Sequence, residues 1–99
     1  MAAPLERPDL FLLARLLENL ARAPGGVRRT TLQLACRINY TQLERYLDYL
    51  VARRFVAARE DDDGGMLVAI TPEGQAALLA LARAIRDVLR EEFSRGPRP

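Results

Sequence analysis

The side chains best suited to bind a charged ligand lie in residues 41–53. Placed on a helix at 100° per residue, Gln42, Arg45 and Tyr49 share one side with Ala52. An amide, a guanidinium and a phenol can donate or accept hydrogen bonds at base edges and phosphates. The spacing therefore predicts a helix whose outer face can contact nucleic acid.

The other side of this stretch is apolar at helical spacing, which is typical of a helix lying on a core. Its predicted core residues are Leu43, Tyr46, Leu47, Leu50 and Val51. Thr41 and Glu44 have the spacing of a capping box, so we expect the helix to begin at Thr41.

A shorter helix is predicted just before it, capped by Thr30 or Thr31. Its inward residues would be Leu32, Leu34, Ala35 and Cys36, with Ile38 closing the turn. Asn39 and Tyr40 interrupt the pattern. Two short helices joined by a tight turn indicate a helix-turn-helix, in which the second helix enters a DNA groove. The alternative is an ordinary helical hairpin, since every soluble helix has a polar face.

Positive charge is concentrated on this segment, although the whole chain carries only +2. All 15 basic residues are Arg, and seven of them fall in residues 26–59 against Glu44 and Asp48, a local net charge of +5. The next six residues, 60–65, hold four acids. An anionic partner would therefore meet the predicted helix-turn-helix.

The residue types needed for most catalytic and metal sites are missing. The chain has no His and one Cys, which argues against Ser-His or Cys-His catalysis and against a conventional zinc or iron site. No glycine-rich phosphate loop occurs. Cys36 is expected to be a small buried apolar residue, and a role as a redox sensor or nucleophile is the disfavoured alternative. We expect no enzyme activity, no metal and no cofactor.

No apolar run is long enough to cross a membrane, and residues 1–9 lack the pattern of a secretory signal. These features predict a cytoplasmic protein without a membrane partner.

The first predicted helix runs from a cap at Asp9 to about Arg22. Its leucines cover about half of its circumference, wider than one core contact usually needs. Either it is sandwiched deeply in the core or part of it faces another subunit, and we favour the second. Residues 23–26, Ala-Pro-Gly-Gly, end this helix, and Val27-Arg28 can add a short strand.

Two β-prone runs, 55–59 and 66–70, flank the acidic turn 60–65 and predict an antiparallel hairpin, or wing. Thr71 then caps a last helix with Pro72 at its first position, continuing to about Phe93. The apolar stripe of this helix comprises Leu78, Leu81, Ala82, Ile85, Val88, Leu89 and Phe93.

A last helix of this length outruns so small a body, which favours pairing with a second copy of the chain. The expected dimer interface consists of Leu12, Leu16, Leu78, Leu81, Ile85, Val88 and Leu89. The alternative is packing of the stripe on the first helix of the same chain.

The predicted fold is mainly α with a small β-hairpin, a winged helix-turn-helix with a long C-terminal helix. The expected segments are an extended segment 1–8, a winged helix-turn-helix domain 9–71 (recognition helix about 41–53, wing about 55–70), a C-terminal dimerisation helix 72–93 and a flexible tail 94–99.

This order of elements resembles the archaeal ArnR-like winged-helix proteins and the small archaeal DNA-binding proteins with a C-terminal dimerising helix. The matching stretches are 29–32 (RTTL), 38–43 (INYTQL), 46–50 (YLDYL), 55–56 (FV) and 70–74 (ITPEG). The last of these is also similar to MarR- and PadR-type regulators.

The resemblance implies a homodimer on double-stranded DNA, with the recognition helix in the major groove and the wing on the adjacent backbone. The implied DNA contacts are Tyr40, Thr41, Gln42, Arg45 and Tyr49 in the groove, with Arg28, Arg29, Arg37 and Arg59 on phosphates. Two features depart from the pattern: Arg54 stands where such families often have Gly, and the wing turn is acidic.

The leading hypothesis is a sequence-specific transcriptional regulator. Because four acids beside a polyanion cost affinity, the wing is either angled away from DNA or binds a protein. The alternatives are therefore a protein–protein adaptor acting through the acidic wing, or an architectural protein that coats DNA without sequence preference.

Overall fold

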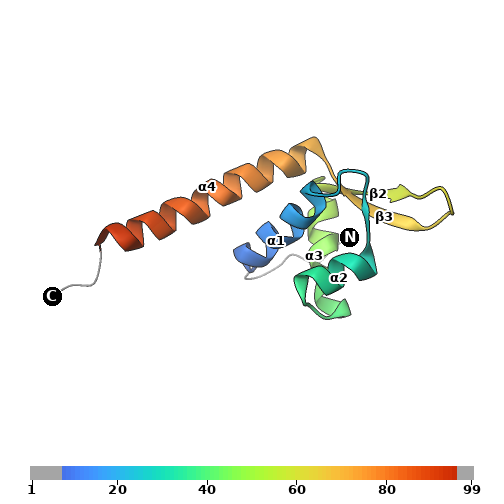
Figure 1. Ribbon diagram of the computed structural model, residues 1–99, viewed down its shortest axis with the longest axis horizontal. Coiled ribbons are helices and arrows are strands. Elements are labelled where there is room, and N and C mark those ends of the chain that lie inside the picture. Colours follow the sequence, from blue (N-terminus) through green and yellow to red (C-terminus); the bar gives the residue numbers. More distant parts are fainter. Residues whose placement is uncertain (1–7, 96–99) are drawn as a thin grey trace.

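The computed structural model describes residues 8–95, with side chains described for residues 8–91. Its elements, in chain order, are α1 (Leu10–Ala21), β1 (Val27–Arg28), α2 (Arg29–Cys36), α3 (Tyr40–Ala52), β2 (Val56–Glu60), β3 (Met66–Ile70) and α4 (Pro72–Arg95). The strands form an antiparallel sheet in the order β1-β3-β2. The fold is a winged helix-turn-helix, mainly helical as predicted. Figure 1 shows α4 running from the wing past α1 and away from the other helices.

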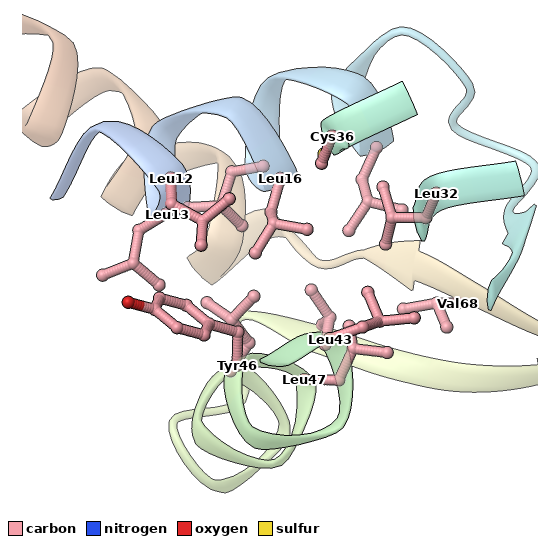
Figure 2. Close-up of a cluster of buried hydrophobic side chains, with 13 residues drawn as sticks. Leu12, Leu13, Leu16, Leu32, Cys36, Leu43, Tyr46, Leu47 and Val68 are labelled. Carbon is pink, nitrogen blue, oxygen red and sulfur yellow. The ribbon is translucent and has the colours of Figure 1, made fainter. Parts of the chain in front are cut away.

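Helix α1 is the centre of the hydrophobic core. Asp9 caps it as predicted, its carboxylate accepting a hydrogen bond from the Leu12 amide at 3.1 Å. The leucines of α1 share one buried cluster with residues of α2 and α3, and α1 also contacts β3 and α4, so most of its wide apolar arc is covered within one chain. Figure 2 shows α1 leucines facing Leu43 and Leu47 of α3 and Leu32 of α2.

This packing contradicts part of the expected dimer interface. Leu12 and Leu16 are 1% and 0% exposed within a single chain, so they are core residues and cannot also face a second copy. The preference for an α1 surface facing another subunit was wrong for these leucines. These two leucines follow the sandwiched alternative, because α1 has neighbours of the same chain on several sides. Only Leu10 and Phe11 at its start remain exposed among its large apolar residues.

Helix α2 begins at Arg29, before both predicted caps. Arg28 occupies the cap position, and its side chain makes no capping hydrogen bond to the helix, so capping by Thr30 or Thr31 is wrong. The chain passes directly from β1 into the helix, because Arg28 is paired with Leu67 of β3 in extended conformation. The start of α2 is thus determined by the sheet rather than by a capping hydroxyl.

Helix α3 is capped by Asn39 instead of Thr41. The Asn39 side chain accepts a hydrogen bond from the Gln42 amide at 2.8 Å, and the helix begins at Tyr40. Asn caps a helix at least as well as Thr and comes earlier in this chain. The predicted Thr41–Glu44 capping box is therefore wrong, and Glu44 pairs with Arg29 of α2 instead.

Three residues assigned to the core lie on the surface. Leu34 is 78% exposed and Val51 is 50% exposed, and Ala35 is also exposed. In the eight-residue α2 only Leu32 and Cys36, four positions apart on one side of the helix, are buried. Leu34 and Ala35 lie on other sides of this helix.

Helices α2 and α3 both end on an Arg in the left-handed conformation, Arg37 with φ 55° and Arg54 with φ 62°. After α3, the Phe55 amide donates to Leu50 O and the Arg54 amide to Val51 O, both at 2.9 Å. This is the Schellman arrangement, in which Gly usually fills the left-handed position. The Arg54 departure noted in the sequence is therefore a strained backbone position at the entrance of the wing.

Helix α4 starts as predicted, with Thr71 as its cap and Pro72 as its first residue. This start also closes the base of the wing. The Thr71 hydroxyl donates to Arg54 O at 2.6 Å and accepts from the Gly74 amide at 2.9 Å. Gly74 is buried against the Phe55 carbonyl, where a Cβ atom would collide with that oxygen and lie 2.8 Å from Ile70 Cγ1. Wing and α4 are thus joined by close backbone contact.

Helix α4 has 24 residues, two more than predicted at its end. Its first half packs on the core, leaving Leu78 and Leu81 half-buried. Its second half extends beyond the body, where Val88 and Leu89 are 59% and 45% exposed. Residues 94 and 95 of the predicted tail are helical, and residues 96–99, like residues 1–7 of the predicted extended segment, lie outside the described residues.

Candidate nucleic-acid interface

The outer face of α3 is open to solvent, but it is rotated from the predicted one. Thr41, Arg45, Asp48 and Ala52 are exposed, whereas Gln42 is only half-exposed. Counting Val51 as a core residue displaced the predicted outer side by a fraction of a turn. The buried row of Leu43, Tyr46, Leu47 and Leu50 defines the true inner side.

Tyr49 lies at the edge of this face and packs partly on the core. Its ring faces the guanidinium of Arg53, with 4.9 Å between Arg53 Cζ and the ring centroid. This cation–π contact and the core packing hold the phenol at one flank of α3. Asp48, which the sequence pattern did not select, takes the more central position.

The inner side of α3 is firmly held. Leu43, Leu47 and Leu50 are each at most 2% exposed, and the Tyr46 hydroxyl accepts a hydrogen bond from the Asp9 amide at 2.9 Å. The ion pair of Arg29 with Glu44 joins α2 to α3. The outer face of α3 is thus carried by a rigid support, as precise recognition of a ligand requires.

The basic residues of the helix-turn-helix fall into two groups. Arg28 pairs with Asp61 at 3.0 Å, Arg29 pairs with Glu44, and Arg59 donates to the Gly25 carbonyl at 3.3 Å. A second group is exposed and has no side-chain hydrogen bond or ion pair with another described residue. It consists of Arg37, Arg45, Arg53 and Arg54, of which Arg53 contacts the ring of Tyr49.

The wing loop bends its acids partly onto the domain itself. Asp61 is half-buried, and one of its carboxylate oxygens accepts from the Asp63 amide at 3.1 Å while the other contacts Arg28. The Asp63 amide first, and then the Arg28 charge, hold the pKa of the Asp61 carboxyl below its ordinary value of 3.8. Glu60, Asp62 and Asp63 remain exposed. One of the four wing charges is therefore neutralised within the chain.

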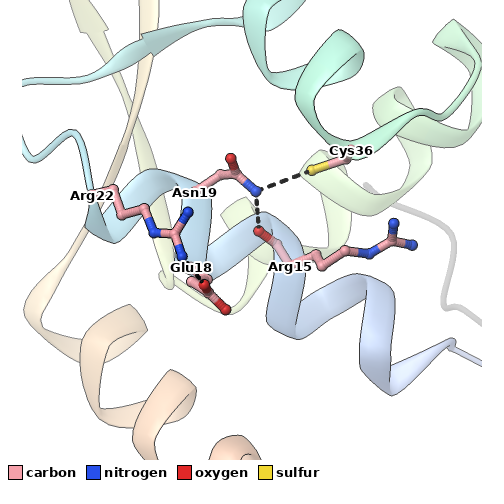
Figure 3. A network of polar contacts seen from close by, with 5 residues as sticks. All are labelled: Arg15, Glu18, Asn19, Arg22 and Cys36. Carbon is pink, nitrogen blue, oxygen red and sulfur yellow. Dashed lines mark hydrogen bonds and ion pairs between the residues drawn. The ribbon is translucent and has the colours of Figure 1, made fainter.

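Cys36 is a buried packing residue, as predicted. The Asn19 side-chain amide donates to Cys36 Sγ at 3.7 Å and to the Arg15 carbonyl at 2.8 Å (Figure 3). Burial raises the pKa of the thiol, and the nearby Arg15 charge lowers it less. The thiol is 0% exposed, so these surroundings do not favour a reactive thiolate.

A second surface feature lies between α1 and the projecting half of α4. It is an open groove of about 680 Å³ with a mainly apolar floor and charged edges. The groove is lined by Phe11, Ala14, Arg15, Glu18, Leu78, Ala82, Ile85, Arg86, Leu89 and Arg90. Three of the expected dimer-interface residues, Leu78, Ile85 and Leu89, therefore share one surface.

No cluster of three His, Cys, Asp or Glu side chains in the described residues could hold a metal ion. None of the helices described has the length and apolar content to cross a membrane.

No protein-family model and no curated protein matches this sequence. Solved structures do match. The transcriptional regulator BldR from Sulfolobus solfataricus superposes with a TM-score of 0.75 at 21% identity, covering 85% of this chain and 60% of that one. A MarR-family regulator from Silicibacter pomeroyi gives a TM-score of 0.67 at 27% identity, covering 89% and 59%. The winged helix-turn-helix fold is shown.

A third match has nearly the same length as this chain. Sso10a-2, a DNA-binding protein from Sulfolobus solfataricus, superposes with a TM-score of 0.70 at 23% identity, covering 94% of this chain and 99% of that one. These neighbours support a winged-helix architecture of the MarR type. They do not single out the archaeal ArnR-like proteins.

Proposed function

We propose that this protein is a sequence-specific, double-stranded-DNA-binding transcriptional regulator that acts as a homodimer, with no enzyme activity. The observation that carries the proposal is the exposed face of α3, where Arg45 is free of described partners above a fully buried leucine row. Helix α3 enters the major groove, and the wing follows the neighbouring backbone. The match to regulators and to a DNA-binding protein supports this function.

The contacts divide by position on the fold. Arg45 and Thr41, with Tyr40, Gln42 and Tyr49 at the margins, face base edges. Arg37 contacts phosphate directly because its guanidinium is already free. Arg28, Arg29 and Arg59 reach phosphate only by leaving Asp61, Glu44 and the Gly25 carbonyl, so each contributes less net affinity. We also propose that the chain is related to the archaeal ArnR-like winged-helix proteins.

The homodimer is proposed to form through the projecting half of α4. Val88 and Leu89 are exposed there, and Leu78, Leu81 and Ile85 are half-buried along the same stripe. Exposed apolar surface on a helix that leaves the body favours a second copy as its cover. Leu12 and Leu16 are excluded from this interface because they are core residues.

The test is a DNA titration with the full chain at several salt concentrations, using random and selected duplexes. Arg45→Ala should weaken selected duplexes about tenfold more than random ones. Arg83→Ala removes the same charge from an exposed position on α4 and should leave that ratio unchanged. Absence of any binding at about 50 mM salt, where phosphate contacts are strongest, would reject the proposal.

A second candidate function is a protein–protein adaptor that uses the acidic wing. The exposed Glu60, Asp62 and Asp63 motivate it. A basic partner that co-purifies and is lost when Asp61, Asp62 and Asp63 are replaced by Ser would favour it. A third candidate, an architectural DNA-coating protein, would show equal affinity for random and selected duplexes.

A further inference from the structure

Asp48 stands in the middle of the exposed face of α3, and the proposed function gives it no role. It lies one turn after Arg45 and one turn before Ala52, and all three are exposed. No described residue forms a hydrogen bond or ion pair with its carboxylate. Arg45 and Asp48 therefore present a cation and an anion side by side, neither of them paired with another residue that the structure describes.

A free carboxylate at this position is unfavourable near DNA unless something compensates it. Phosphate repels it, and losing its hydration without a new donor costs free energy. In the major groove the available donors are the exocyclic amines of cytosine and adenine. Adenine also presents the acceptor N7 beside its amine, which repels a carboxylate, whereas cytosine presents the N4 amine without a neighbouring acceptor of its own.

We propose that Asp48 is a specificity-determining residue that accepts a hydrogen bond from cytosine N4, while Arg45 donates to guanine O6 and N7. This inference rests on the proposed function of DNA binding. Because the two side chains are one helical turn apart, they read bases of neighbouring pairs. Asp48 then acts mainly by rejecting other bases, which leave its carboxylate without a donor.

The test is selection from a randomised duplex library with the full chain and the variants Asp48→Ala and Asp48→Asn. The wild type should enrich cytosine at one position. Asp48→Ala should lose that preference by about tenfold while binding random duplexes more tightly. Asp48→Asn should move the preference at the same position towards adenine, because an amide matches adenine N6 and N7. Asp87→Ala, which removes the same charge from an exposed position on α4, should change neither.

The outcomes separate the two proposals. If Asp48→Ala binds every duplex more tightly and keeps the wild-type preference, Asp48 is only a repulsive charge, and this inference falls while the regulator proposal stands. If the wild type selects a guanine that has no G·C pair next to it, the inference also falls. If the wild type binds no duplex at all, the proposed function and this inference fall together.

Discussion

The carboxylate of Asp61 in the wing loop lies 3.0 Å from the guanidinium of Arg28 on β1, although the two residues are 33 positions apart. The wing stem is held at the same side by Arg59, which donates to the Gly25 carbonyl. A wing acid therefore occupies one of the arginines expected to contact phosphate. Under the proposed function, the wing and the phosphate backbone would compete for the same cation.

Asp61→Asn should increase affinity for random duplex DNA. The change removes one negative charge and leaves Arg28 free for a phosphate, so the slope of log affinity against log salt should steepen by about one. Asp62→Asn removes an equal charge from an exposed position without touching Arg28, so its slope should stay as in the wild type. Identical slopes for the two variants would show that Arg28 does not reach DNA.

The Asp61 carboxyl should also make stability depend on pH in the acid range. Its pKa is lowered in the fold, mainly by the Asp63 amide and then by Arg28. Because its pKa is lowered in the fold, the ionised carboxyl stabilises the folded state at pH values above 3.8, its ordinary pKa. This stabilisation is lost as the pH falls through the lowered pKa. Urea unfolding across the acid range should show a wild-type advantage over Asp61→Asn that disappears below that value. An advantage that persists there would contradict the assignment.

Gly74→Ala should destabilise the protein by about 3 kcal/mol or more. The added Cβ would collide with the Phe55 carbonyl, a backbone atom that cannot move without opening the base of the wing. Gly25→Ala is the matched control, since nothing lies within 4 Å of a Cβ at that position. Denaturant unfolding measures both variants. A loss of stability equal to that of Gly25→Ala would show that the Phe55–Gly74 contact is not this close in solution.

Arg54→Gly should stabilise the fold by about 1 kcal/mol, since the left-handed conformation at φ 62° costs about that much for a side-chain-bearing residue. Ala52→Gly, at the last residue of α3, should instead destabilise the fold by less than about 1 kcal/mol, because Gly is a weaker helix former than Ala. Both changes introduce Gly, but Arg54→Gly should raise the urea concentration at the midpoint of unfolding and Ala52→Gly should lower it. Destabilisation by both would contradict the left-handed assignment.

Leu16→Ala should lower the stability of the fold, whereas Val88→Ser should weaken the proposed dimer. Leu16 is fully buried within one chain, so its truncation should lower the free energy of unfolding by about 2–5 kcal/mol. Val88 is 59% exposed, so Val88→Ser should weaken the proposed dimer in sedimentation equilibrium and leave the secondary structure intact. A dimer unaffected by Val88→Ser would place the interface elsewhere.

Much of the fold follows from local sequence chemistry. Asp9 and Thr71 start their helices where predicted, since a capping side chain needs only its own first turn. The hairpin follows equally from two β-prone runs around a Gly-containing turn, and it forms between Val56–Glu60 and Met66–Ile70. Such features depend on residues a few positions apart.

Which side chains are buried and which are exposed depends on packing between elements that are distant in the sequence. Helical spacing grouped Leu12 and Leu16 correctly, but only the positions of the other elements determined that these two leucines are covered within one chain. Pairing of β1 with β3 determined where α2 begins.

The candidate site shows most clearly which features local sequence predicts and which depend on distant contacts. The sequence by itself determined that α3 is amphipathic and lies in a cationic segment. The tertiary structure decided that Asp48 rather than Tyr49 stands at the centre of its exposed face, and that Arg28 and Arg29 are already paired. The physical reason is that periodicity relates residues within one helix, whereas exposure and pairing depend on neighbours that are distant in the sequence.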